Sequence, residues 1–232
     1  MNYIIIIKSV VYRVYSAVIT FAISFILTGS IRLSAVIGVL DGLVKIFSYS
    51  LFDLWWQRIV HNYKPCVIWL TGLSGAGKTT IGDELYKKLK SRNAKCVILD
   101  GDEIRKIFPA LGFTKEARIK HNINVGYMAS ILENQGYIVI ITLVSPFAEA
   151  RDKCRTLAKN FIEVYVSTSI EVCEKRDVKG LYKKARNNEI KEFTGIDSPY
   201  EVPVSPELIL PTESFNLKDC VNKIFTKINK LK

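Results

Sequence analysis

The chain has 232 residues, of which 33 are basic and 22 acidic, so its formal net charge is +11 at pH 7. This length allows one well-buried domain and a smaller second part. The positive charge suits anionic ligands or a membrane surface, but no basic block interleaved with aromatics occurs, so we expect no nucleic-acid partner. Five widely spaced cysteines indicate reduced thiols, and two histidines do not support a histidine-based metal site.

Two apolar segments occupy residues 1–60. They run from Val14 to Thr28 and from Leu33 to about Trp56, and a short turn, Gly29-Ser30-Ile31-Arg32, separates them. Each segment is close to the roughly 20 residues that cross a hydrocarbon core as a helix. A cleaved signal peptide would contain one such segment instead of two. The sequence therefore predicts a membrane helical hairpin over residues 1–60.

Charged residues around and within these segments indicate their orientation. Lys8 and Arg13 precede the first segment and Arg58 follows the second, so the positive-inside rule places both ends in the cytoplasm. We therefore expect a membrane-anchored protein whose remaining chain faces the cytoplasm.

Asp41 and Lys45 are four residues apart and share a helix face. We favour a self-neutralising pair at a helix-packing face over a polar oligomer contact or a transport step.

Short apolar runs alternate with amphipathic segments from residue 65 onward. Strands are predicted at 66–71, 95–99, 137–144, 161–166 and 207–210, and helices at 124–134, 148–159, 170–176 and 217–231. Ile81, Leu85 and Leu89, spaced by four, predict a further helix. Such alternation indicates an α/β fold with a parallel sheet and helices on both faces. Residues 180–205 are polar, contain proline and break the pattern, which we interpret as a mobile lid.

A glycine-rich motif follows the first of these strands. It matches the pattern G-x-x-x-x-G-K-[ST] in full, as Gly72-Leu73-Ser74-Gly75-Ala76-Gly77-Lys78-Thr79. In this context the backbone N–H groups cradle phosphates at a helix N-terminus, Lys78 reaches the β- and γ-phosphates, and Thr79 supplies a hydroxyl to Mg²⁺. The loop therefore predicts nucleotide triphosphate binding, with ATP and Mg²⁺ as cofactors, but it leaves the acceptor of the γ-phosphate open. The small domain with a basic lid that excludes water favours a P-loop kinase with a small-molecule acceptor.

A second polar motif ends the second predicted strand, as Asp100-Gly101-Asp102-Glu103-Ile104-Arg105. In open α/β sheets this edge faces the ligand crevice. A carboxylate here can orient an acceptor hydroxyl or act on the Mg²⁺ shell, and Arg105 can hold an anionic acceptor. Taken alone, the motif fits a turn with solvated carboxylates equally well.

Further motifs follow these two in a fixed order. They are Gly112-Phe113-Thr114, Ser145-Pro146-Phe147, the run RDVKGLYKKAR at 176–186, and the run EIKEFTGIDSPYE at 189–201. Together the motifs resemble the adenylylsulfate (APS) kinases, which make 3′-phosphoadenylylsulfate from APS and ATP. The resemblance covers nearly all of residues 65–232 and implies an APS kinase domain there, with APS as substrate. Residues 1–60 resemble a two-helix membrane module of unknown function. We also expect a homodimer.

The resemblance implies a role for each matching residue. The ATP site comprises Gly72, Leu73, Ser74, Gly75, Ala76, Gly77, Lys78, Thr79 and Thr80, which hold the phosphates. Phe215 and Cys220 belong to it as well, at the positions where the family holds the adenine base of ATP. The APS site comprises Asp102, Glu103, Ile104, Arg105, Phe113, Arg118, His121, Val144, Ser145, Lys179, Glu192 and Phe193. Lys78, Asp102 and Ser145 are the catalytic candidates. Ser145 matches a serine assigned as a phosphoserine intermediate in bacterial members, but direct in-line transfer needs no covalent step, so we favour a substrate hydrogen bond.

One segment departs from the family pattern D-R-x-x-N. Ala117 replaces the acid, and His121 stands where the asparagine is expected, with Asn122 one position later. Either His121 donates a hydrogen bond to the acceptor, or a small register shift brings Asn122 in.

Two alternatives to an APS kinase therefore stay open. One is a related kinase with another anionic acceptor, and the other is a membrane-bound nucleotide-binding module without turnover.

Overall fold

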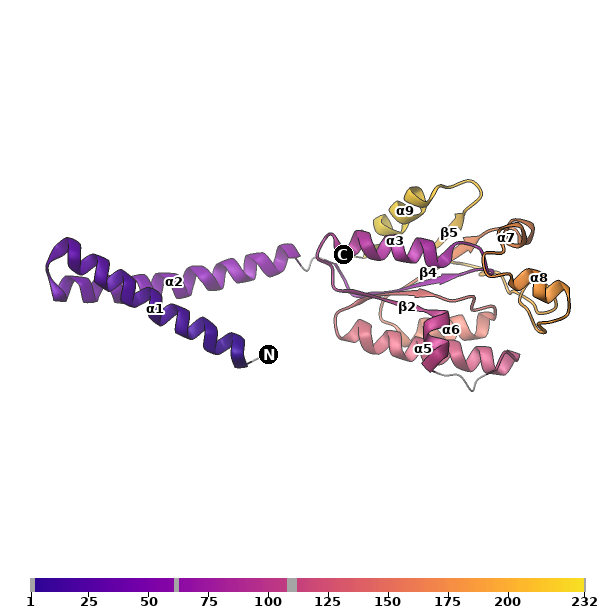
Figure 1. Ribbon diagram of the computed structural model, residues 1–232, viewed down its shortest axis with the longest axis horizontal. Helices are drawn as coiled ribbons and strands as arrows, with labels where there is room; N and C mark the ends of the chain where they lie inside the picture. The colour runs from indigo at the N-terminus through magenta and orange to yellow at the C-terminus, as the bar shows by residue number, and fades with distance from the viewer. Residues whose placement is uncertain (1–2, 61–62, 108–111, 232) are drawn as a thin grey trace. The chain divides into compact units, whose positions relative to one another are not determined.

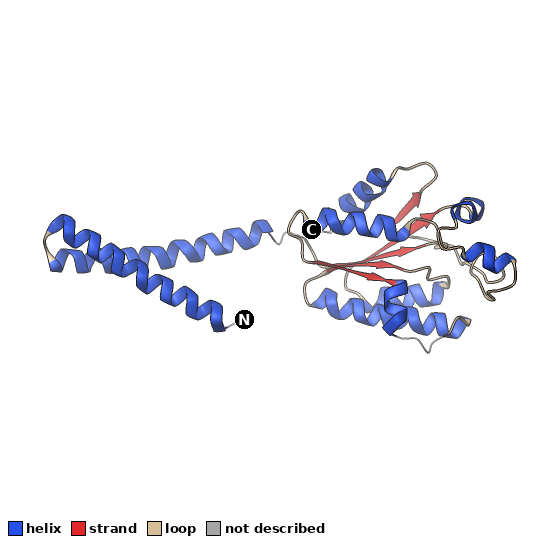
Figure 2. Cartoon of the chain, in the orientation of Figure 1, coloured by secondary structure: helices blue, strands red, loops and turns tan. Residues whose placement is uncertain are grey.

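The computed structural model describes residues 3–60, 63–107 and 112–231, and their side chains except those of 3–14, 46, 49–50 and 52–60. Contacts within the chain divide it into two compact units, Met1–Val60 and His61–Lys232. The first unit is helical and the second is an α/β fold (Figure 2).

The first unit consists of helices α1 (Tyr3–Thr28) and α2 (Ile31–Val60), which pack against each other. Gly29 ends α1 in the left-handed region, at a φ of 64°, where a glycine has no Cβ penalty. Both helices extend beyond the apolar segments that predicted them. Within the described residues, no helix combines the length and the apolarity that crossing a bilayer requires.

Polar side chains meet between α1 and α2. Asp41 Oδ2 accepts hydrogen bonds from Thr20 Oγ1 at 2.8 Å and from Lys45 Nζ at 2.6 Å. Lys45 Nζ also donates to Ser16 Oγ at 2.7 Å. The pair thus neutralises itself within α2 while bonding to α1, which supports the helix-packing interpretation.

The second unit is built on a parallel sheet. Its five described strands are β1 (Cys66–Thr71), β2 (Cys96–Asp100), β3 (Ile138–Thr142), β4 (Phe161–Ser167) and β5 (Leu208–Pro211), in the order β2-β3-β1-β4-β5. The described helices are α3 (Lys78–Lys90), α4 (Gly101–Ile107), α5 (Lys115–Asn134), α6 (Ala148–Leu157), α7 (Ile170–Arg176), α8 (Leu181–Arg186) and α9 (Leu217–Asn229). Figure 1 shows α3 and α9 on one face of the sheet and α5 and α6 on the other. The predicted α/β class is confirmed.

The central strands carry the core on both faces. Every residue of β1 and β3 is buried, because helices cover both sides of a parallel sheet. Alternate residues point to opposite faces, so Ile68 packs with Leu85 beneath α3, whereas Trp69 packs with Val125 beneath α5. This buried frame holds the carboxyl ends of the strands at one edge of the sheet.

Three helical segments differ from the prediction. The segment after β2 begins α4 instead of a turn, because Asp100 Oδ1 accepts a hydrogen bond from Asp102 N at 2.9 Å in its first turn. Helix α5 begins at residue 115 instead of 124, since Thr114 Oγ1 caps it through Ala117 N. Helix α8 lies within the expected lid, where Asp177 accepts hydrogen bonds from Tyr182 N and Lys183 N.

Candidate active site

A cavity of about 910 Å³ lies at the carboxyl ends of the central strands. Small-molecule sites commonly have about 300–1,000 Å³. The predicted site residues in its wall are Ser74, Gly75, Ala76, Gly77, Lys78, Thr79, Thr80, Asp102, Arg105, Phe113, Arg118, Val144, Ser145, Lys179, Phe193, Phe215 and Cys220. The predicted residues that do not line it are Gly72, Leu73, Glu103, Ile104, His121 and Glu192. Both predicted halves of the site therefore open into one cavity.

The glycine-rich loop connects β1 to α3. A Cβ on Gly72 would lie 2.6 Å from the carbonyl oxygen of Val166, so no larger residue fits there without a shift. Gly77 precedes α3 at a φ of 101°, in the left-handed region. Loop N–H groups and a helix N-terminus together form an anion site.

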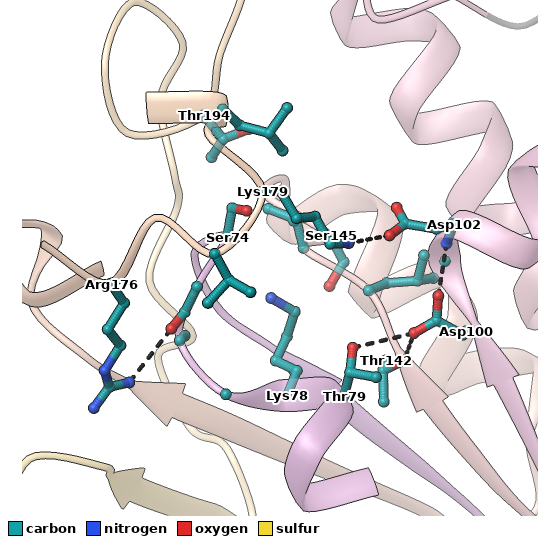
Figure 3. Close-up of a pocket in the computed structure, with 18 of the residues that line it drawn as sticks. Ser74, Lys78, Thr79, Asp100, Asp102, Thr142, Ser145, Arg176, Lys179 and Thr194 are labelled. Carbon is teal, nitrogen blue, oxygen red and sulfur yellow. Dashed lines mark hydrogen bonds and ion pairs between the residues drawn. The ribbon is translucent and has the colours of Figure 1, made fainter. Parts of the chain in front are cut away.

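Lys78 is a buried cation at the floor of this loop. Its side chain is 8% exposed, and its Nζ donates to the carbonyl oxygens of Gly72 at 2.9 Å and Leu73 at 2.7 Å. Burial lowers the pKa of Lys78 to about 8. Burial and these two hydrogen bonds therefore hold the ammonium group beside the loop with little access for water. Figure 3 shows the Lys78 side chain among the residues that line the cavity.

Asp100 gathers three hydrogen bonds at the end of β2. Its Oδ2 accepts from Thr79 Oγ1 at 3.1 Å and from Thr142 Oγ1 at 2.7 Å, and its Oδ1 accepts from Asp102 N (Figure 3). Burial raises the pKa of Asp100, but these hydrogen bonds outweigh it and lower the pKa below the ordinary value. An ionised carboxylate beside a threonine hydroxyl is an oxygen donor set that fits Mg²⁺. Among the described residues, no group of three or more His, Cys, Asp or Glu could hold a metal, so phosphates and water would complete the shell.

Two arginines flank an aromatic ring on the other side of the cavity. The guanidinium carbons of Arg105 and Arg118 lie 4.7 Å and 5.6 Å from the ring centre of Phe113, and this phenylalanine is 56% exposed. Arg118 Nε also donates to the Phe113 carbonyl oxygen at 2.7 Å. A flat ring beside two cations offers stacking to a base and charge to an anion.

The expected lid contacts both halves of the site. Tyr182 donates from its hydroxyl to the carbonyl oxygen of Ser74 at 2.9 Å and packs edge-on against Phe193, with ring centres 5.0 Å apart. Arg118 Nη1 donates to Thr194 Oγ1 at 3.0 Å. Lys179, at the base of this segment, forms an ion pair with Asp102 (Figure 3). These contacts connect the segment to the phosphate loop, to α5 and to α4.

Ser145 occupies a strained and fully bonded position. Its φ is 41°, in the left-handed region that favours glycine, and the residue is buried. Its Oγ donates to Thr71 Oγ1 at 2.8 Å and accepts from Trp69 Nε1 at 3.0 Å. Its carbonyl oxygen accepts from Arg151 Nη1 at 2.7 Å, and the buried Arg151 pairs with Glu163. The hydroxyl hydrogen is thus already used within the protein.

The structure separates the two candidates on α5. His121 is fully buried outside the cavity wall, and burial lowers its pKa to about 4, so the ring is neutral at physiological pH. Asn122 lines the cavity, and among the described residues its Nδ2 has no hydrogen-bond partner. Of the two candidates, Asn122 therefore borders the cavity and His121 does not.

Several cavity residues had no role assigned from the sequence, among them Thr142, Arg176 and Tyr182, whereas Asp100 was noted only within its motif and Asn122 only as the alternative to His121. Asp100 and Thr142 are partners in the β2–β3 register, so both side chains end their strands at one edge. The strand-end position of Asp100 was a usable signal. Arg176 Nη1 donates to the Gly75 carbonyl oxygen at 3.3 Å, a contact that only the folded chain brings about.

The sheet order, the phosphate loop and the segment over it define an α/β P-loop kinase. Residues 64–211 match the family described as adenylylsulphate kinase, and residues 6–57 match the family described as predicted membrane protein (DUF2061). The chain belongs to the adenylylsulphate kinase family.

Individual relatives agree with this assignment. The chain is 48% identical over 165 residues to the adenylyl-sulfate kinase of Rippkaea orientalis, covering 71% of this chain and 91% of the relative. It is 50% identical over 160 residues to the adenylyl-sulfate kinase of Clostridium kluyveri, covering 68% of this chain and 80% of that relative. The APS kinase of Mycobacterium tuberculosis in complex with AMPPNP and APS superposes with a TM-score of 0.68 at 34% identity, covering 71% of this chain and 97% of the other. A hexameric APS kinase from Thiobacillus denitrificans superposes with a TM-score of 0.55 at 25% identity, covering 72% of this chain and 29% of the other.

Proposed function

We propose that the protein transfers the γ-phosphate of ATP to the 3′-hydroxyl of adenosine 5′-phosphosulfate, giving 3′-phosphoadenylylsulfate and ADP. The family and the relative bound to AMPPNP and APS support this activity. The observation that carries it is one cavity whose wall includes both the phosphate loop and the arginine-flanked Phe113. A P-loop NTPase that uses water would not need the second half of this wall.

On the ATP side, we assign the phosphates to the loop of residues 72–80 and to Lys78. Thr79 and Asp100 would hold Mg²⁺, which neutralises charge on the phosphate oxygens when it is bound. Phe215 and Cys220 lie in the cavity wall, where they would contact the ATP base. Burial raises the pKa of the Cys220 thiol, so this side chain stays neutral and acts by packing.

On the acceptor side, we assign the adenine of APS to stacking between Phe113 and Phe193. Arg105 and Arg118 would bind its anionic part, with Asn122 as a further polar contact. Asp102 would accept a hydrogen bond from the 3′-hydroxyl, which orients this oxygen for in-line attack. Lys179, which now pairs with Asp102, lies at the base of the lid and would turn to the phosphates.

Direct transfer between the two substrates is the mechanism that we favour. Ser145 Oγ donates to Thr71 Oγ1 and accepts from Trp69 Nε1, and neither partner is a base that would take up the serine proton for nucleophilic attack. We assign Ser145 to shaping the cavity beside the acceptor. The segment of residues 180–205 would exclude water from the transferring phosphate, which suppresses hydrolysis of ATP.

Turnover tests this activity directly. The full chain in detergent micelles, supplied with Mg-ATP, is expected to form ADP only when APS is added, with a kcat on the order of 1–100 s⁻¹. Product analysis should find one 3′-phosphoadenylylsulfate per ADP. Equal rates with other anionic nucleotides would favour a related kinase with another anionic acceptor. ATP binding without ADP formation would favour a membrane-bound nucleotide-binding module without turnover.

Lys78 leads to a specific pH dependence of ATP binding. Because burial lowers its pKa to about 8, the free enzyme loses this positive charge as the pH rises through 8, whereas an ordinary lysine keeps it up to about 10.4. The KM for ATP is therefore expected to be constant below pH 7 and to increase toward tenfold per pH unit above 8. Steady-state kinetics at saturating APS and Mg²⁺ measure this, and a KM that stays flat to about pH 9.5 would contradict it.

We further propose that residues 1–60 are a membrane hairpin that anchors the kinase domain of residues 65–232 at the cytoplasmic face. The match to the family described as predicted membrane protein supports this, as do exposed apolar side chains along both helices, including Ile26, Leu27, Val39 and Phe47. The polar contacts between α1 and α2 leave those apolar side chains for lipid. Flotation of the full chain with neutral vesicles tests this anchor.

We retain the homodimer as a proposal for the assembly. The hexameric relative from Thiobacillus denitrificans supports association within the family. Tyr127 and Ile131, one turn apart on the exposed side of α5, offer an apolar contact for a second copy.

A further inference from the structure

The kinase unit carries a basic surface at the amino ends of its strands. Three segments form it: 63–65 before β1, 86–95 from the last turn of α3 to the start of β2, and 224–231 at the end of α9. These segments contain no aspartate or glutamate. Their basic residues, called the basic surface from here on, are Lys64, Lys87, Lys88, Lys90, Arg92, Lys95, Lys227 and Lys230.

Phe225 joins the three segments physically. Its ring packs edge-on against Tyr63, with ring centres 5.9 Å apart. Lys88 Nζ lies 4.6 Å and the Arg92 guanidinium carbon 4.9 Å from the centre of the same ring. Lys88 also donates to the side chain of Asn222 on α9. The positive charges are therefore held together by packing and are not spread along a flexible tail.

Most of this charge is not neutralised by neighbouring acids. Six of the eight side chains are exposed, and Lys88 and Lys227 are half-buried. Within the described residues, Lys87 has an acidic partner, Glu84, at 3.7 Å, and the other members of the basic surface form no ion pair. Clusters of this size beside a membrane anchor attract anionic lipid headgroups.

The position of the surface agrees with such a role. Tyr63 follows Val60, the last residue of α2, by three residues, so the chain enters the kinase unit at the basic surface. The strand arrows in Figure 2 point away from it, toward the end of the unit that carries the cavity. A headgroup contact at the amino ends would therefore leave the substrate cavity open to solvent.

We propose that the basic surface binds the anionic lipid headgroups of the membrane in which the hairpin is anchored. The proposal rests on the membrane hairpin of the proposed function. Nucleic acid is the less suitable occupant, because Phe225 is only 8% exposed and its ring is occupied by Lys88 and Arg92. Single-stranded nucleic acid stacks on open aromatic faces, and Phe225, the ring at the centre of the basic surface, does not offer one.

Lysine acylation of the full chain on vesicles tests the proposal. Flotation first measures binding to neutral phosphatidylcholine vesicles and to vesicles with about 30% phosphatidylserine. A brief pulse of an amine-acylating reagent and peptide mass spectrometry then give the rate at each lysine. Lys64, Lys90, Lys227 and Lys230 are expected to react at least about threefold more slowly on the anionic vesicles, and this protection should disappear near 0.5 M NaCl.

A pair of matched variants supplies the control. Lys90→Glu with Lys230→Glu should abolish the protection of Lys64 and Lys227. Lys120→Glu with Lys153→Glu, at exposed positions of α5 and α6, changes the net charge by the same amount as the first pair. This second pair should leave the protection of Lys64 and Lys227 intact. Both variants are expected to keep the turnover of the parent chain, since none of these side chains lines the cavity.

The outcomes distinguish this proposal from the anchor. Flotation with neutral vesicles together with equal acylation on both vesicle types would keep the anchor and overturn the basic-surface contact. Flotation only with anionic vesicles, lost in the Lys90/Lys230 variant, would keep the contact and overturn the anchor. Failure to float with either would overturn both. Protection by single-stranded RNA but not by anionic vesicles would assign the surface to nucleic acid.

Discussion

The Lys78→Ala variant is expected to lose about a thousandfold in kcat while its melting temperature stays equal or rises. The ammonium group faces developing charge on the transferring phosphate from a buried position, and loss of one such group costs about two to three orders of magnitude. Because burial lowers the pKa of Lys78, its charged form costs stability in the free enzyme, so removing it does not weaken the fold. ADP release under saturating substrates and thermal denaturation measure the two effects.

Lys87→Ala is the matched control for this variant. Lys87 is on the same helix, exposed and outside the cavity wall, so its removal should change kcat by less than about twofold. A Lys78→Ala enzyme with near-parental kcat would contradict the assignment of the phosphate loop. A large fall in melting temperature would instead mean that Lys78 acts by holding the loop through Gly72 and Leu73.

The Asp102→Asn variant is expected to lose between about a hundredfold and ten-thousandfold in kcat, with little change in the KM for ATP. The amide keeps the shape of the side chain but does not accept the proton of the 3′-hydroxyl as a carboxylate does. The concentration of Mg²⁺ that gives half-maximal rate should stay unchanged, because Asp100, and not Asp102, bonds to Thr79. Titration of Mg²⁺ at saturating APS separates these two roles.

Two comparison variants make this result specific. Glu103→Gln alters the next residue of α4, whose carboxylate pairs with Lys106 outside the cavity, and should leave kcat near the parental value. Asp100→Asn should raise the Mg²⁺ requirement. If Asp102→Asn behaves like Glu103→Gln, the acceptor is oriented by another group and the assignment of Asp102 is wrong.

Pattern and spacing alone predicted the order of strands along the chain and the parallel sheet. Short apolar runs matched the buried strands within a few residues, because both faces of a parallel sheet exclude water. Helices α4 and α8 were missed because each is short and depends on local hydrogen bonds to Asp100 and Asp177 instead of on an apolar face. The early start of α5 was missed for a similar reason, since Thr114 caps a first turn without strong apolar periodicity.

The choice between His121 and Asn122 illustrates a limit of reading a sequence. Neighbouring helical residues point about 100° apart, so a single position decides whether a side chain lines a cavity or the core. The phase of α5 follows from its cap and from close packing on α6, where a Cβ on Gly126 would lie 2.6 Å from Cys154 Sγ. The family pattern left both residues open as acceptor contacts, whereas the packed helix turns His121 inward and leaves Asn122 at the cavity.

The sequence by itself determined the phosphate loop, because its chemistry resides in contiguous backbone N–H groups, in glycines with positive φ and in the adjoining Lys78 and Thr79. Only the tertiary structure decided which distant residues meet this loop. The strand order β2-β3-β1 brings Asp100 beside Thr142 and Thr79, and folding brings Tyr182 to Ser74 across more than a hundred residues. Such contacts depend on how the strands pair and how the helices pack, and no local pattern encodes the resulting distances.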